Sequence, residues 1–191
     1  ERGRPVLVWR FEHPVRCIAS TVLGGGLAER SWVLNATVDL GYRHPDPASD
    51  AAAMARALRL PPAEGAALLT GVDVRRFVPA VDGGAELVAT VGLGTGTINV
   101  VAWVPAPVHD AALVNLVATI AEAKAQAFTD TGTPGTGTPT DAVVVCCPSG
   151  IGPDDDDHRY GGPVSTWGAR VAAAALQAVR EGIERDRAAR W

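Results

Sequence analysis

Short runs rich in apolar and β-branched residues, separated by more polar stretches with turn residues, predict seven extended segments. Such runs are typical of β-strands. The predicted strands are residues 5–12, 15–23, 31–40, 72–80, 85–92, 97–104 and 141–147. The last is a continuous apolar run, as in a strand covered on both faces. We expect a turn at His13-Pro14 and a break of the second strand at Gly24–Gly26.

Helical spacing and helix-start signals predict four helices between these strands. They cover residues 48–59, 62–69, 109–128 and 164–188. Strands occur both as hairpin-like neighbours and as units separated by helices. This favours an α+β fold, a single layered domain over residues 1–191 with a mixed or antiparallel sheet packed against helices. The alternative is an α/β fold, although no glycine-rich strand-to-helix turn opens the chain.

Composition narrows the function classes. The chain has 191 residues and a formal net charge of −4, which argues against a nucleic-acid partner. No apolar run is long enough to span a bilayer, and no signal-peptide pattern is present, so we expect a cytoplasmic protein without a membrane partner. The three cysteines favour buried, reduced thiols over disulfides, with a cysteine nucleophile as the alternative.

Lys124 is the only lysine beside sixteen arginines, and it lies in the predicted helix 109–128. At about 100° per residue it falls on the apolar stripe of that helix. The stripe consists of Leu113, Leu116, Val117, Ile120 and Ala127. A lysine there either snorkels past the helix end or faces a pocket as a general base, oxyanion stabiliser or substrate anchor. Glu122 points to the opposite side.

The segment GTGTPTD at 135–141 leads from a loop into the buried strand 141–147. Its threonines offer hydroxyl groups, and Asp141 stands at the mouth of the strand, where a carboxylate caps, pairs or catalyses. Asn99 and Asn35 interrupt apolar strands, and a buried amide must satisfy its hydrogen bonds either within the fold or on a ligand. Among the histidines, His44 in GYRHPDP is the candidate for a binding site.

Metal binding is not expected. Asp154–Asp157 with His158 could hold an ion, but an acidic, solvated turn is the simpler interpretation. GLGTG at 92–96 precedes a strand and is therefore not a dinucleotide fingerprint.

Taken in order, these segments resemble the adenosylcobinamide amidohydrolase (CbiZ) family over nearly the whole chain. The matching motifs are GGG at 24–26, VLNATV at 33–38, ATVGLG at 89–94, GTINVV at 96–101, EAKAQAF at 122–128, TGTPTDAVVV at 136–145 and YGGPVSTWG at 160–168. Two positions differ. Ala121 replaces a threonine that usually precedes EAK, and only Gly94 and Thr95 separate Leu93 from Gly96, where the family tends to carry a longer segment. This segment is either deleted or absent from the chain as given.

The resemblance implies a corrinoid-salvage enzyme that hydrolyses the amide joining the aminopropanol arm to the corrin ring of adenosylcobinamide, giving adenosylcobyric acid. The corrinoid would be the substrate, and no resident cofactor is expected. The alternatives are a non-catalytic corrinoid-binding protein and an amidohydrolase acting on another amide. Whether copies of the chain form a homo-oligomer is left open.

Amide hydrolysis needs a nucleophile, a stabilised oxyanion and a proton for the leaving amine. We predict that Thr136, Thr138 or a water attacks and that Asp141 or Lys124 handles the proton. Asn99 or Asn35 would bind the oxyanion. The further substrate-binding candidates are Glu122, Gly25, Thr97 and His44.

Overall fold

The computed structural model describes residues 4–150 and 152–189. Its strands are β1 (Val6–Ala19), β2 (Gly26–Thr37), β3 (Gly65–Thr70), β4 (Val78–Asp82), β5 (Ala85–Gly92), β6 (Thr97–Trp103) and β7 (Ala142–Pro148). Its α-helices are α1 (Pro47–Ala57), α2 (Asp110–Asp130), α3 (Asp156–Arg159) and α4 (Thr166–Ala188). Two short 3-10 helices cover Pro62–Glu64 and Val74–Arg76.

All seven strands form one mixed sheet in the order β3-β2-β1-β7-β6-β5-β4. The pairs β2–β3 and β6–β7 are parallel, and the other neighbours are antiparallel. Helices α1, α2 and α4 pack against strands of this mixed sheet, so the expected α+β arrangement is confirmed.

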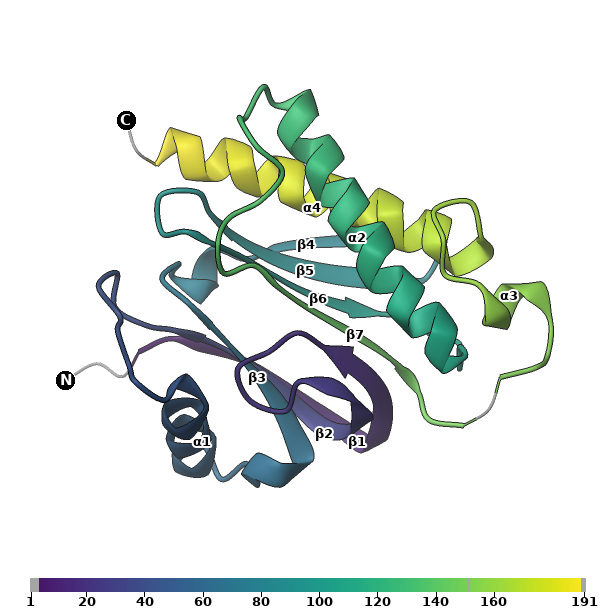
Figure 1. The fold of residues 1–191 in the computed structure, drawn as a ribbon, viewed down its shortest axis with the longest axis horizontal. Coiled ribbons are helices and arrows are strands. Elements are labelled where there is room, and N and C mark those ends of the chain that lie inside the picture. Colours follow the sequence, from purple (N-terminus) through teal and green to yellow (C-terminus); the bar gives the residue numbers. More distant parts are fainter. Residues whose placement is uncertain (1–3, 151, 190–191) are drawn as a thin grey trace.

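Helices α2 and α4 cover one face of the sheet (Figure 1). Their apolar side chains, among them Leu113, Leu116 and Ile183, form one buried cluster with residues of β4 to β7. Gly182 lets α4 approach the sheet closely, because a Cβ there would collide with Val91. Helix α1 packs separately, against a small cluster on β2 and β3.

The sheet rolls toward its other face, so that β3 contacts β6 although three strands separate them in the sheet. Val33, Leu68, Val101 and Val144 from four different strands meet inside this roll. The inner face of the roll, meaning the side chains that point into it from β2, β3, β5, β6 and β7, also positions the polar residues described below.

The predicted helix 62–69 is wrong, because residues 65–70 form strand β3. Ala and Leu favour a helix locally, but parallel pairing with β2 decides the structure. Gly65 opens the strand because the ring of Trp32 occupies the place where a Cβ would stand.

The predicted turn at His13-Pro14 is also wrong. β1 runs on to Ala19, and its pairing with β2 shifts register between Arg10 and Val15. A bulge accommodates Pro14, which has no backbone N–H to give to a sheet. Gly24, with φ of +70°, lies in the turn between β1 and β2, and Gly26, with φ of +91°, is the first residue of β2. The expected break therefore separates two strands.

The expected extended segment 72–80 is a strand only from Val78, because a 3-10 helix covers Val74–Arg76 first. Across residues 4–150 and 152–189, no helix is long and apolar enough to cross a membrane.

Candidate active site

Lys124 and Asp141 form a shielded ion pair where α2 passes the start of β7. The Lys124 Nζ donates to Asp141 Oδ2, and the two side chains are 15% and 13% exposed. Lys124 therefore faces the protein, as the helical phase predicted, and does not snorkel into solvent. A cation in such a place is held by its carboxylate partner.

Asp141 is the centre of a cluster of hydrogen bonds. Besides Lys124, its carboxylate accepts from the backbone N–H of Thr138 at 3.0 Å, from the Thr138 hydroxyl, and from the backbone N–H of Ile98 at 2.8 Å. These donors come from the loop before β7, from β6 and from α2. The carboxylate thus fixes the Thr138 hydroxyl and the Lys124 ammonium relative to each other.

Gly137 lies directly against this pair. A Cβ at this position would come 2.5 Å from Asp141 Oδ2 and 2.6 Å from Lys124 Nζ, so a side chain here would displace the pair. Thr136, one residue earlier, is exposed, and its hydroxyl has no hydrogen bond within the described chain. Of the two predicted threonine nucleophiles, only Thr138 therefore contacts Asp141.

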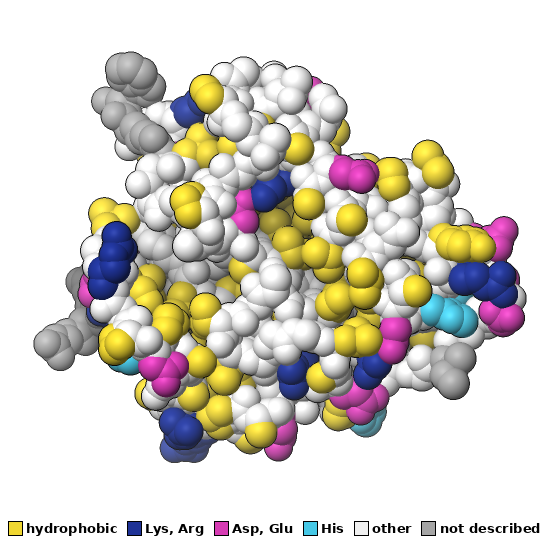
Figure 2. All heavy atoms as spheres, in the orientation of Figure 1, with side chains coloured by type: hydrophobic (Ala, Val, Ile, Leu, Met, Phe, Trp, Pro, Cys, Tyr) yellow, Lys and Arg dark blue, Asp and Glu magenta, His cyan; other side chains and the backbone are white. Residues whose placement is uncertain are grey.

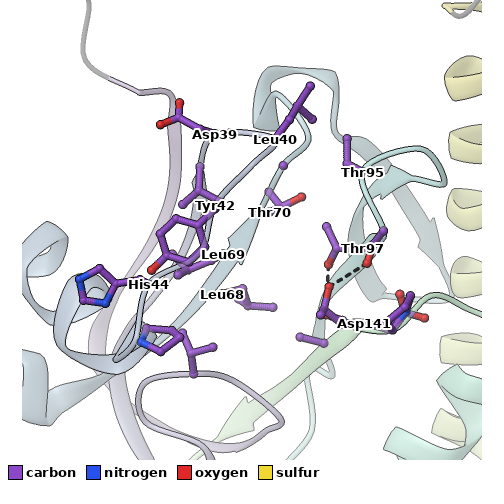
Figure 3. Close-up of a pocket in the computed structure, with 18 of the residues that line it drawn as sticks. Asp39, Leu40, Tyr42, His44, Leu68, Leu69, Thr70, Thr95, Thr97 and Asp141 are labelled. Carbon is purple, nitrogen blue, oxygen red and sulfur yellow. Dashed lines mark hydrogen bonds between the residues drawn. The ribbon is translucent and has the colours of Figure 1, made fainter.

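A cavity of about 610 Å³ adjoins the cluster, and Asp141, Thr140 and Thr97 line one wall of it. The opposite wall comes from the segment between β2 and α1, including Tyr42 and His44. Leu68, Leu69 and Thr70 lie between the two walls (Figure 3). The cavity thus opens between the rolled edge of the sheet and the loop that precedes Asp141.

The wall formed by Tyr42 and His44 is anchored to α1. The Tyr42 hydroxyl donates to Asp50 at 2.9 Å, and its ring lies nearly parallel to that of His44, with centroids 6.2 Å apart. Burial and this hydrogen bond raise the pKa of Tyr42 to about 12. Tyr42 therefore stays a neutral donor, and His44 beside it is exposed.

Asn35 and Asn99 form a buried polar bridge behind the cavity. Asn99 Nδ2 donates to Asn35 Oδ1 at 2.9 Å and to the Leu69 carbonyl at 3.1 Å. Asn35 Nδ2 donates to Thr90 at 3.1 Å. Both hydrogens of the Asn99 amide are therefore used inside the roll. The bridge joins β2, β3, β5 and β6, and a direct contact of Asn35 or Asn99 with substrate stays a prediction.

Thr97 links this bridge to the cavity. Its hydroxyl lies 3.1 Å from Asn99 Oδ1 and 3.1 Å from the Thr140 carbonyl, and Thr97 itself lines the cavity. Thr140 in turn donates to the Gly96 carbonyl at 2.7 Å. The turn before β6 and the loop before β7 are thus tied together at the cavity wall.

Four predicted substrate-binding residues lie outside the cavity lining: Asn35 and Asn99 behind it, and Glu122 and Gly25 at the surface. Glu122 is exposed on α2, as its helical phase predicted, and Gly25 is exposed in the turn between β1 and β2. Their roles stay predictions. Ser20 and Val22, from the same turn as Gly25, do reach the cavity.

Sequence reasoning missed Tyr42, Gly137, Thr140 and Ser20. The first three stand inside motifs that had been singled out, GYRHPDP and GTGTPTD, so motif membership was the available signal. Nothing local marks Ser20, which reaches the cavity because β1 ends there beside β7, with its hydroxyl accepting from Val143 N at 3.0 Å.

The cysteines are buried and unbridged, as expected. Cys146 belongs to the cluster inside the roll and Cys147 to the helix-covered cluster, so adjacent cysteines do point to opposite faces. Burial raises the pKa of the Cys147 thiol, whereas a hydrogen bond with the opposing Cys146 lowers that of Cys17. Among the described residues, no group of three or more His, Cys, Asp and Glu side chains is placed to hold a metal ion.

Asp141 lines the cavity, and Lys124 and Thr138 bond to its carboxylate from behind the lining. A hydroxyl, a carboxylate and an ammonium in contact are groups that a hydrolase site uses. A family model described as adenosylcobinamide amidohydrolase (CbiZ) matches residues 1–190. The chain belongs to this family of amide-hydrolysing enzymes.

Two curated proteins named adenosylcobinamide amidohydrolase are similar to the chain. The one from Halobacterium salinarum is 42% identical over 90 residues, which are 47% of this chain and 36% of that protein. The one from Methanosarcina mazei is 28% identical over 179 residues, which are 86% of this chain and 88% of that protein. The alignment thus spans about a third of the first relative and most of the second.

Proposed function

We propose that the chain hydrolyses the amide that joins the aminopropanol arm to the corrin ring of adenosylcobinamide. The products are adenosylcobyric acid and 1-amino-2-propanol. The observation that carries this proposal is the family match over residues 1–190. The corrinoid is the substrate and not a resident cofactor, and the reaction belongs to corrinoid salvage in the cytoplasm.

Thr138 is the nucleophile in this proposal. Its hydroxyl already donates to Asp141, which takes the proton as Thr138 Oγ1 bonds to the amide carbon. Asp141 then passes this proton to the leaving nitrogen as the carbon–nitrogen bond breaks. Water hydrolyses the resulting ester on Thr138, which releases the acid and restores the hydroxyl.

Lys124 holds the carboxylate of Asp141 in place and balances its charge. The tetrahedral intermediate carries a negative charge on its oxygen, and a nearby ammonium stabilises it electrostatically. The pair therefore serves two steps: it orients the base before attack and offsets the charge that develops during attack.

The test is turnover of adenosylcobinamide followed by mass analysis. We expect wild-type protein to release adenosylcobyric acid, and Thr138→Ser to retain measurable turnover. Thr138→Val, which keeps the shape but removes the hydroxyl, should lose about 100-fold or more in kcat. Rapid quenching should show an acyl adduct on Thr138.

Wild-type turnover by Thr138→Val would contradict Thr138 as the nucleophile and would indicate that water attacks the amide. Glu181→Gln is the matched control, because it breaks an exposed ion pair with Arg185 on α4, away from the cavity lining. We expect this variant to turn over at the wild-type rate.

One observation favours a second candidate, a non-catalytic corrinoid-binding protein. Ala121 is exposed one helical turn before Lys124 and carries no hydroxyl where the family usually has threonine. Binding of adenosylcobinamide without release of the acid would support this candidate. Acid release from other amides in a substrate panel, but not from adenosylcobinamide, would indicate a different amidohydrolase.

A further inference from the structure

The cavity is small for the whole of a corrinoid. Its volume of about 610 Å³ lies within the range, roughly 300–1,000 Å³, of pockets that enclose a drug-sized ligand. A corrin ring with its amide arms and upper ligand is larger than such a ligand. A cavity of this volume has room for one amide arm but not for the macrocycle as well.

Leu40 stands at this mouth. It lines the cavity, and its side chain is 77% exposed, so it is accessible to a ligand at the mouth. It faces Thr95 across Gly71, since a Cβ on Gly71 would lie 3.1 Å from Thr95 Cβ and 3.5 Å from Leu40 Cδ2 (Figure 3). The hairpin between β5 and β6 turns tightly here, with Gly96 N donating to the Gly92 carbonyl at 2.9 Å.

Val22 provides a second exposed apolar side chain at the cavity, 43% exposed, from the turn after β1. The other exposed large apolar residues of the described chain do not line the cavity. The inner wall, in contrast, carries Thr97, Thr140 and Asp141. Beside the exposed polar residues Asp39, Arg43 and His44, the mouth therefore offers two apolar side chains to a ring, and the wall near Asp141 offers polar groups to an amide arm.

We propose that Leu40, with Val22, forms an apolar rim that receives the corrin macrocycle while the aminopropanol arm enters the cavity toward Asp141. Leu40 is thus a specificity determinant for amides attached to a large apolar ring. This inference rests on the proposed function for the identity of the substrate. It adds which part of the substrate each part of the site contacts.

The experiment compares two amides in the wild type and in Leu40→Ser. The first is adenosylcobinamide, and the second is a small propanamide that carries the same 2-hydroxypropyl arm without the macrocycle. Exposed rim contacts are made equally in ground and transition states, so their loss raises KM and leaves kcat unchanged. We expect about a tenfold rise in KM for adenosylcobinamide and no change in kcat/KM for the small amide.

Leu40→Met is the conservative variant and should keep the wild-type KM. Val81→Ser is the matched control, because Val81 is 63% exposed on β4, outside the cavity lining. The Kd of adenosylcobinamide, followed by its visible absorbance, is measured for every variant so that binding is read without turnover.

An unchanged KM and Kd in Leu40→Ser would contradict the proposed role of Leu40 without affecting the proposed hydrolase function. A higher Kd in Leu40→Ser, together with no acid release by the wild type, would support the proposed rim and contradict the proposed function. Equal losses on the small amide would also overturn the rim, because Leu40 would then act on the arm or on the fold.

Discussion

The two faces of the sheet are built from different residues. The face covered by α2 and α4 is packed almost wholly with aliphatic side chains, such as Leu113, Val179 and Ile183. The inner face of the roll also contains Asn35 and Asn99, with three threonines, all nearly fully buried. The first face fixes the position of α2, and hence of Lys124. On the inner face, hydrogen bonds replace part of the apolar packing, and these bonds hold the cavity wall in place.

Figure 2 shows apolar side chains gathered across the middle of one side of the molecule, with most charged side chains toward its edges. If the two faces have separate roles, substitutions in the helix-covered cluster should change stability alone, whereas substitutions near the inner face should change catalysis or the hydrogen bonds that hold the cavity wall. Four predictions test this division.

Ile183→Ala should have the largest effect, on stability alone. Ile183 is fully buried between α4 and the sheet, so truncation leaves a cavity and costs about 2–5 kcal/mol in the free energy of unfolding. Urea unfolding measures this loss, and Ile183→Val should cost about 0.5–1.5 kcal/mol. Well below the unfolding transition, kcat should match the wild type. A large loss of kcat at such low urea would contradict the separate roles of the two faces.

Gly137→Ala should act on catalysis. The added methyl group would meet both Lys124 Nζ and Asp141 Oδ2, so the pair must move. A displacement of this size costs about 100-fold in kcat, with both charges retained. Gly41→Ala is the control, since a Cβ there has no atom within 4 Å. Equal rates for the two variants would show that the geometry of the pair does not matter.

Asn99→Ala should cost less, about 1–3 kcal/mol in the free energy of unfolding, because it leaves buried partners of the amide unsatisfied. A double-mutant cycle with Asn35→Ala should show coupling of about 0.5–3 kcal/mol, since the two amides bond to each other. Additive losses in urea unfolding would contradict the bridge between β2 and β6.

The smallest expected effect concerns the pH at which the Tyr42 phenol ionises. Its pKa is raised to about 12, so the difference between wild-type and Tyr42→Phe ultraviolet spectra should show tyrosinate forming near that pH. An unfolded tyrosine titrates near pH ~10. The stabilisation by the neutral phenol is therefore complete below about pH 10 and is lost between about 10 and 12. Tyrosinate formation near the ordinary tyrosine pKa would show that the wall does not shield Tyr42.

Much of the fold follows from periodicity, and the failures have physical causes. The inward position of Lys124 and the outward position of Glu122 follow from helical phase alone. Strand β3 could not be found in this way, because its Ala- and Leu-rich sequence becomes a strand only through pairing with β2 and the space that Gly65 leaves for Trp32.

The sequence predicted the motifs that make up the site but not how these motifs are arranged in space. Asp141 and Thr138 stood in one motif and Lys124 in another, and only the packing of α2 beside β7 brings them together. Likewise, Asn35 and Asn99 are 64 positions apart, and the rolling of the sheet makes them neighbours. Sequence reasoning identified these amides as buried groups in need of partners, but it could not show that each was the other's partner.

The central claim is that the Lys124–Asp141 pair carries amide hydrolysis. The most direct measurement is the kcat for release of adenosylcobyric acid by wild-type protein, Lys124→Arg and Asp141→Asn, with circular dichroism to confirm that each is folded. We predict a loss of about 100- to 1,000-fold in both variants. Near-wild-type rates in both folded variants would contradict the account.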